Sequence, residues 1–205
     1  MKLVDIPVIF ICPDHNEKYH ARKEHMVELL TKIGFKSITH HKSGNQSYPT
    51  CLLEAFIDIL KMYLDDTPII VIEDDVEPFL DLNSETEFFM PEDTDAFYMG
   101  FSHSGGSKTL NSHEGSSKIK KIDQTHIRIL NMLTTHAILY KSRRYKQRVI
   151  NELTNLLDKP FYHSDVIIAR LQPEYNVYGY HYPLFYQSAK WGNVQYTEDA
   201  TKIRF

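Results

Sequence analysis

The chain has 205 residues, a formal charge of −4 and an apolar fraction of 42%, with 13 tyrosines and 11 phenylalanines. This composition is that of a globular protein and excludes a disordered chain. The mild negative charge argues against a nucleic-acid partner, because proteins that coat a phosphate backbone carry a basic excess or stripe. No linker divides the sequence, so we expect a single domain over residues 1–205, which is also compatible with the first module of a longer polypeptide.

No apolar run approaches the ~20 residues needed to cross a bilayer, so we expect no transmembrane segment. The apolar start of the chain contains Asp5 and lacks the residue order of a signal peptide, which favours a strand. The two cysteines, Cys12 and Cys51, have neither a metal-binding spacing nor a partner framework for disulfides. We therefore expect reduced thiols and a cytoplasmic location, in the host cytoplasm if the protein is viral.

Predicted strands and helices alternate in the first half of the chain. Apolar runs predict strands over residues 4–12, 35–41, 68–72 and 95–101. The helix after the first strand begins behind a cap at Asp14 or Asn16 and stops at Gly34. A second helix has Pro49 as an early residue.

The second half of the chain is mixed. Residues 102–117, rich in Ser, Gly and His, predict a mobile loop, and residues 119–122 and 126–130 predict a hairpin. Strands are expected over 134–140 and 176–182. Between them we predict a helix capped by Ser142 and a short helix capped by Ser164 that ends before Pro173. The pattern indicates an α/β fold with a mostly parallel sheet, helices on both faces and a small antiparallel addition.

Polar segments follow three of the predicted strands. They are Asp14, the loop 43–47, and the consecutive acids Glu73, Asp74 and Asp75, which we call the acidic triplet. Ligands of open α/β sheets bind beyond the carboxyl ends of the strands. We therefore expect these segments to meet at one edge of the sheet.

The acidic triplet ends a buried, β-branched strand, where three adjacent carboxylates raise one another's pKa and are costly to bury. A divalent cation resolves this conflict, and oxygen ligands favour Mg²⁺ or Mn²⁺, with a diphosphate completing the coordination. In extended backbone Glu73 and Asp75 point to one face and Asp74 to the other. The alternative is a solvated group of acids that decorates the end of a strand.

The segment Ile70–Val76, which contains the acidic triplet, resembles the metal-binding "EDD" form of the motif in glycosyltransferases of the GT-A fold. Further segments resemble the lipopolysaccharide-type branch of this group, including a chlorella-virus-encoded glycosyltransferase domain. They are the opening strand and basic helix (residues 11–35), the helix before the metal motif (47–60), the following strand (95–100), a later "THAY"-like strand (135–140) and the closing region (163–165 and 176–178). The loop 13–16 departs from that branch, and 102–117 has no counterpart in it.

The resemblance implies a nucleotide-diphospho-sugar transferase that moves a sugar from a UDP-sugar donor to a glycan or glycoprotein acceptor. It assigns direct contact with Mn²⁺ or Mg²⁺ to Asp75, a second or water-mediated contact to Glu73, and the donor ribose to Asp74. Donor-binding positions on other segments are Pro13, Asp14, Arg22 and Ser47, with the Arg22 guanidinium suited to the diphosphate.

Asp165 is the candidate for the acceptor's general base, or for a group that positions the acceptor, although an aspartate in a first helical turn is equally explained by the helix dipole. His181 is a candidate further metal ligand, with a packed strand histidine as the alternative. Trp191 is the first of the aromatic residues to test for stacking on a sugar ring. Two other functions fit the same residues: a metal-dependent nucleotidyl or phosphoryl transferase, and a catalytically silent carbohydrate-binding module.

Overall fold

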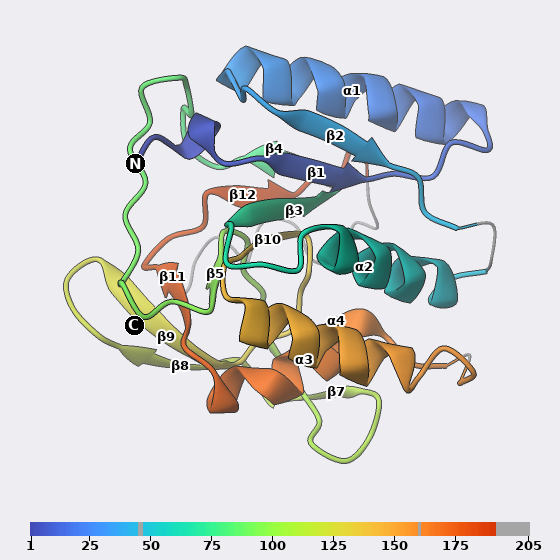
Figure 1. Cartoon of the computed structure of the whole chain (residues 1–205), viewed down its shortest axis with the longest axis vertical. Coiled ribbons are helices and arrows are strands. Elements are labelled where there is room, and N and C mark those ends of the chain that lie inside the picture. Colours follow the sequence, from blue (N-terminus) through green and yellow to red (C-terminus); the bar gives the residue numbers. More distant parts are fainter. Residues whose placement is uncertain (45–46, 160, 192–205) are drawn as a thin grey trace.

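The protein is built around one eight-stranded mixed sheet (Figure 1). The computed structural model describes residues 1–44, 47–159 and 161–191. The strand order is β2-β1-β3-β10-β5-β11-β9-β8. The strands are β1 (Val8–Ile11), β2 (Ile38–His41), β3 (Ile69–Glu73), β5 (Ala96–Tyr98), β8 (Lys118–Lys121), β9 (His126–Asn131), β10 (Ala137–Tyr140) and β11 (Val177–Tyr180).

Six of these strands, β1, β2, β3, β5, β8 and β11, run in the same direction, whereas β10 and β9 are antiparallel to their neighbours. The antiparallel β10 lies between β3 and β5 in the middle of the sheet. This arrangement confirms the predicted mostly parallel sheet with an antiparallel addition.

Helices cover both faces of the sheet, as the alternation predicted (Figure 1). On one face α1 (Glu17–Ile33) packs Met26 and Leu30 against Phe10 and Ile72. The opposite face is covered by α2 (Thr50–Met62), α3 (Arg143–Thr154) and α4 (Ser164–Leu171). Because both faces are covered, the first four side chains of β3 are fully buried, which explains its unbroken β-branched sequence.

The helix ends agree with the predicted caps at three of four positions. The Asn16 side chain accepts a hydrogen bond from the Tyr19 amide (3.1 Å), and Gly34 adopts a φ of 99° that glycine tolerates. Ser142 caps α3 through the Tyr145 amide. The prediction that Ser164 caps α4 is wrong: His163 is the cap residue, without a side-chain bond, and Ser164 is the first helical residue.

Residues 102–117 are not a loop throughout, and this prediction is wrong. They contain a two-stranded antiparallel sheet of β6 (Ser104–Gly106) and β7 (His113–Ser116). Its contacts come from distant segments: Asn131 bonds both backbone groups of Gly106, and Arg170 donates to the carbonyl of Ser107. The Ser- and Gly-rich sequence of residues 102–117 did not indicate these contacts with distant segments.

A second small sheet was not predicted. It pairs β4 (Val76–Pro78), directly after the acidic triplet, with β12 (Phe185–Gln187). Among the described residues, no helix has both the length and the apolar character to span a membrane.

Candidate functional site

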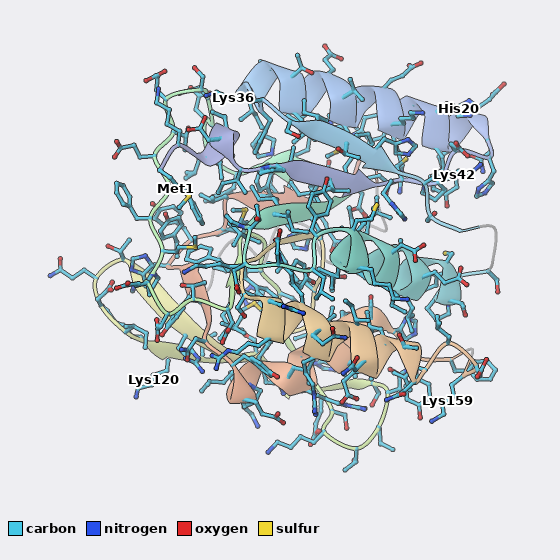
Figure 2. All side chains as sticks on the ribbon, viewed as in Figure 1. Met1, His20, Lys36, Lys42, Lys120 and Lys159 are labelled. Carbon is cyan, nitrogen blue, oxygen red and sulfur yellow. The ribbon has the colours of Figure 1, made fainter. Side chains whose placement is uncertain are left out.

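The carboxyl ends of β1, β2 and β3 lie level with one another. Ile11 is opposite His41 on one side and Glu73 on the other, so the segments that follow these strands leave the sheet at one edge. Figure 2 shows Lys42 and His20 at this end of the molecule, where Lys42 forms an ion pair with Asp14 (2.6 Å). Asn45 and Gln46, in the predicted loop 43–47, lie outside the described residues.

Glu73, the last residue of β3, is held in a shielded and crowded position. The Thr135 hydroxyl donates a hydrogen bond to Glu73 Oε1 (2.6 Å). Burial, followed by the charge of Asp75, raises the pKa of Glu73 to about 8, and Asp165 adds to the rise. A cation next to Glu73 would stabilise the ionised form of its carboxylate.

Asp75 has a free acceptor in this environment. Its Oδ2 receives a weak bond from Gln187 Nε2 (3.4 Å), whereas its buried Oδ1 has no hydrogen-bond partner. Burial, followed by the charge of Asp74, raises the pKa of Asp75 to about 6. The backbone is fixed by β12, because the Ser188 amide donates to the Asp75 carbonyl (2.7 Å).

Asp74 lies on the other side of β3 and forms an ion pair with Arg22 of α1 (2.9 Å). Both residues are buried, at 7% and 8% exposure. Asp74 Oδ2 and Arg22 Nε have no hydrogen-bond partner. The structure thus brings together two residues that were predicted to contact different parts of the donor, and each is already engaged by the other.

Asp165, in the first turn of α4, lies near Glu73 on the face covered by α2 and α4. Burial raises the pKa of Asp165, and the Val166 amide bonded to its Oδ1 partly offsets this. Tyr48, just before α2, is the third member of this group. Burial around its hydroxyl and the charges of Asp165 and Glu73 raise the pKa of Tyr48 to about 12, although 66% of the residue is exposed.

The segment before β10 completes the surroundings of Glu73, and sequence reasoning gave it no part in the site. Thr134 has a φ of 124°, a strained conformation for a β-branched residue, and its hydroxyl contacts the His136 ring. The His136 imidazole lies on Gly100, where an added Cβ would be 1.8 Å from Nε2. The sequence signal that could have indicated this segment is the run of three polar residues, Thr134 to His136, directly before the buried strand β10.

Other predicted site residues lie apart from the carboxylates or have protein partners. The Lys42 hydrogen bond lowers the pKa of Asp14. The carbonyl of Pro13 accepts from the Cys12 thiol (3.1 Å), and Ser47 is exposed before α2.

His181 does not join the site as the predicted metal ligand. It follows β11, three strand positions from β3, which corresponds to about 14 Å across the sheet. Its Nε2 is hydrogen-bonded to the carbonyl of Asp123 (3.0 Å). Trp191 stacks on His25 of α1 (ring centroids 4.7 Å apart) and donates to Glu77, so this tryptophan is packed against the protein.

The acidic triplet offers oxygen ligands to a cation. Within the described ranges, no three His, Cys, Asp or Glu side chains are arranged to hold a metal ion by themselves. Glu73 and Asp75 nevertheless present crowded carboxylates with one unpartnered oxygen. This set fits Mg²⁺ or Mn²⁺, which proteins often hold with one or two carboxylates while substrate phosphates and water complete the shell.

Two solved structures show a distant similarity to this chain. No protein-family model and no curated protein matches the chain. Among solved structures, CTP:phosphocholine cytidylyltransferase from Streptococcus pneumoniae is 9% identical, with 90% of this chain and 93% of that one covered and a TM-score of 0.47. Protein A197 from STIV is 13% identical, with coverages of 88% and 84% and a TM-score of 0.45. Neither similarity indicates a shared function at these values, and the resemblance to GT-A glycosyltransferases stays a prediction.

Proposed function

We propose that the protein is a metal-dependent glycosyltransferase that transfers a sugar from a UDP-sugar to a glycan or glycoprotein acceptor. The observation that carries this proposal is the pair of shielded carboxylates, Glu73 and Asp75, at the carboxyl edge of the sheet. Their raised pKa values and the unpartnered Asp75 Oδ1 mark a place where a cation is stabilising.

On this proposal Asp75 and Glu73 hold Mn²⁺ or Mg²⁺. The ion supplies positive charge that stabilises the nucleoside diphosphate as a leaving group. Thr135 keeps the Glu73 carboxylate in place through its hydrogen bond, and the pairing of β4 with β12 fixes the backbone of Asp75.

The remaining roles fall on either side of β3. Asp165 accepts the proton of the acceptor hydroxyl or positions that hydroxyl, and its raised pKa makes it a stronger base than an exposed aspartate. Pro13 and Asp14, which follow β1, stay candidates for donor binding, as does the exposed Ser47 directly before Tyr48. The buried ion pair of Arg22 and Asp74 ties α1 to the end of β3, in place of the direct contacts with ribose and diphosphate suggested by the resemblance.

Calorimetry with UDP in the presence and absence of Mn²⁺ tests the proposal. We expect metal-dependent binding by the wild-type protein and at least about tenfold weaker binding by Asp75→Asn, which keeps the side-chain shape. Asp81→Asn removes an exposed carboxylate outside the triplet and is the matched control, with unchanged binding. A UDP-sugar screen that measures released UDP then identifies the donor.

Three results would redirect the assignment. UDP binding that is indifferent to Mn²⁺ or to Asp75→Asn removes the metal role of the triplet. Turnover of nucleoside triphosphates with release of pyrophosphate replaces sugar transfer by nucleotidyl transfer. Binding of glycans without any affinity for nucleotide leaves a carbohydrate-binding protein.

A further inference from the structure

Two large aromatic side chains are exposed on the segments that lead into α2 and α4. Tyr48 is 66% exposed and Phe161 is 82% exposed. We call this pair the aromatic platform. A single exposed apolar residue is common on protein surfaces, but two exposed rings on segments next to the half-buried Glu73 and Asp165 call for a partner that covers them.

Polar contacts tie the platform together across three distant parts of the sequence. The Tyr48 hydroxyl is hydrogen-bonded to His163 Nδ1 (3.1 Å), and the two rings lie 5.4 Å apart. Asn111, between β6 and β7, donates to the carbonyl of Phe161 and accepts from the amide of His163 (3.2 Å). Arg170 of α4 donates to the carbonyls of Ser107 and Leu110, which fixes the β6–β7 connection against α4.

The platform adjoins the carboxylates on the α2 and α4 side of β3. The Tyr48 hydroxyl lies within the electrostatic reach of Asp165 and Glu73. His163 is two residues before Asp165 and directly precedes α4. Arg22 and Asp74 lie on the opposite, α1 side of the strand, so the platform and this buried ion pair are on different sides of β3.

We propose that Tyr48 and Phe161 form the acceptor subsite and bind a carbohydrate whose apolar C–H face packs on the rings. This inference rests on the proposed function. A sugar ring has an apolar face and a hydroxylated edge, and the platform combines exposed aromatic rings with the nearby carboxylates of Asp165 and Glu73. With the sugar on the rings, one of its hydroxyls lies toward Asp165, the group assigned to receive the proton.

Saturation-transfer NMR with methyl glycosides of glucose, galactose and mannose tests the subsite, with the full chain, UDP and Mn²⁺ present. We expect transfer to the sugar ring protons in the wild type. The dissociation constant should rise on the order of tenfold in Tyr48→Ala and in Phe161→Ala, and less in Tyr48→Phe, which retains the ring. Phe89→Ala removes a ring that is 57% exposed outside the platform and should leave glycoside binding unchanged.

The possible results separate this inference from the proposed function. Absence of transfer to all three glycosides, or equal binding by wild type and both alanine variants, overturns the acceptor subsite. Metal-dependent UDP binding by the same wild-type sample would then leave the transferase assignment standing. Glycoside binding that depends on the platform without any UDP binding supports the subsite and removes the transferase. Circular dichroism spectra of the variants exclude loss of folding as the cause.

Discussion

Replacing Glu73 by glutamine is expected to stabilise the metal-free protein at alkaline pH. In the unfolded chain Glu73 ionises near its ordinary pKa of 4.5, whereas burial and the neighbouring Asp75 raise its pKa in the folded protein to about 8. The folded state therefore binds the proton more tightly. The stabilisation is fully present below pH 4.5 and is lost as the pH rises toward 8. Glutamine cannot ionise, so the variant escapes this loss.

The size of the effect follows from the width of the pH window. One unit of pKa corresponds to about 1.4 kcal/mol, so the wild type loses up to about 5 kcal/mol that the variant keeps. For a chain of this length 1 kcal/mol changes the melting temperature by about 2–4 °C. We expect Glu73→Gln to melt about 10–20 °C above the wild type at pH 8.5, with the difference closing toward pH 4.5.

Thermal melts followed by circular dichroism between pH 4.5 and 8.5, in EDTA and without nucleotide, measure the effect. Glu28→Gln removes an exposed carboxylate from α1 and should melt in parallel with the wild type. Adding Mn²⁺ should raise the wild-type melting temperature at pH 8.5 more than that of Glu73→Gln, because a ligand stabilises the state that binds it. If Glu73→Gln and the wild type respond to pH identically, the carboxylate does not ionise in the shielded position that our reasoning requires.

Two further substitutions test the packing around the site, both by urea unfolding. Arg22→Met leaves the buried Asp74 unpaired and should lower the free energy of unfolding by about 3–5 kcal/mol. The double variant Arg22→Met/Asp74→Leu should recover most of this loss, whereas simple additivity of the two substitutions would contradict a coupled pair. Gly100→Ala places a Cβ 1.8 Å from His136 Nε2 and should lower the free energy of unfolding by about 1–3 kcal/mol. The loss should be smaller when His136 is also replaced by alanine, and an equal loss in both backgrounds would exclude this clash.

Local patterns in the sequence were sufficient for the elements that carry their own signals. The β-branched run of β3 and the helix stop at Gly34 depend only on neighbouring residues, and both agree with the structure. The antiparallel β10, by contrast, enters the sheet between two parallel strands. That position depends on which strand edges remain open after the rest of the sheet has formed, and no local pattern encodes it.

The same distinction applies to the site. Alternation along β3 predicted that Glu73 and Asp74 face opposite sides, and their different partners, Thr135 and Arg22, agree with it. The identity of those partners was not predictable, because Arg22 is 52 residues from Asp74 and Thr135 is 62 residues from Glu73. Only the folded chain brings these side chains within hydrogen-bonding distance.

The Arg22–Asp74 pair also sets the charge that the site presents outward. Arg22 balances one of the three carboxylates of the acidic triplet from within the protein. When both are ionised, Glu73 and Asp75 carry two negative charges in a shielded setting where each raises the cost of the other. A monovalent ion would leave one of them uncompensated, whereas a divalent ion matches both. The preference for Mn²⁺ or Mg²⁺ in the proposed function thus follows from the one carboxylate that the chain has already paired.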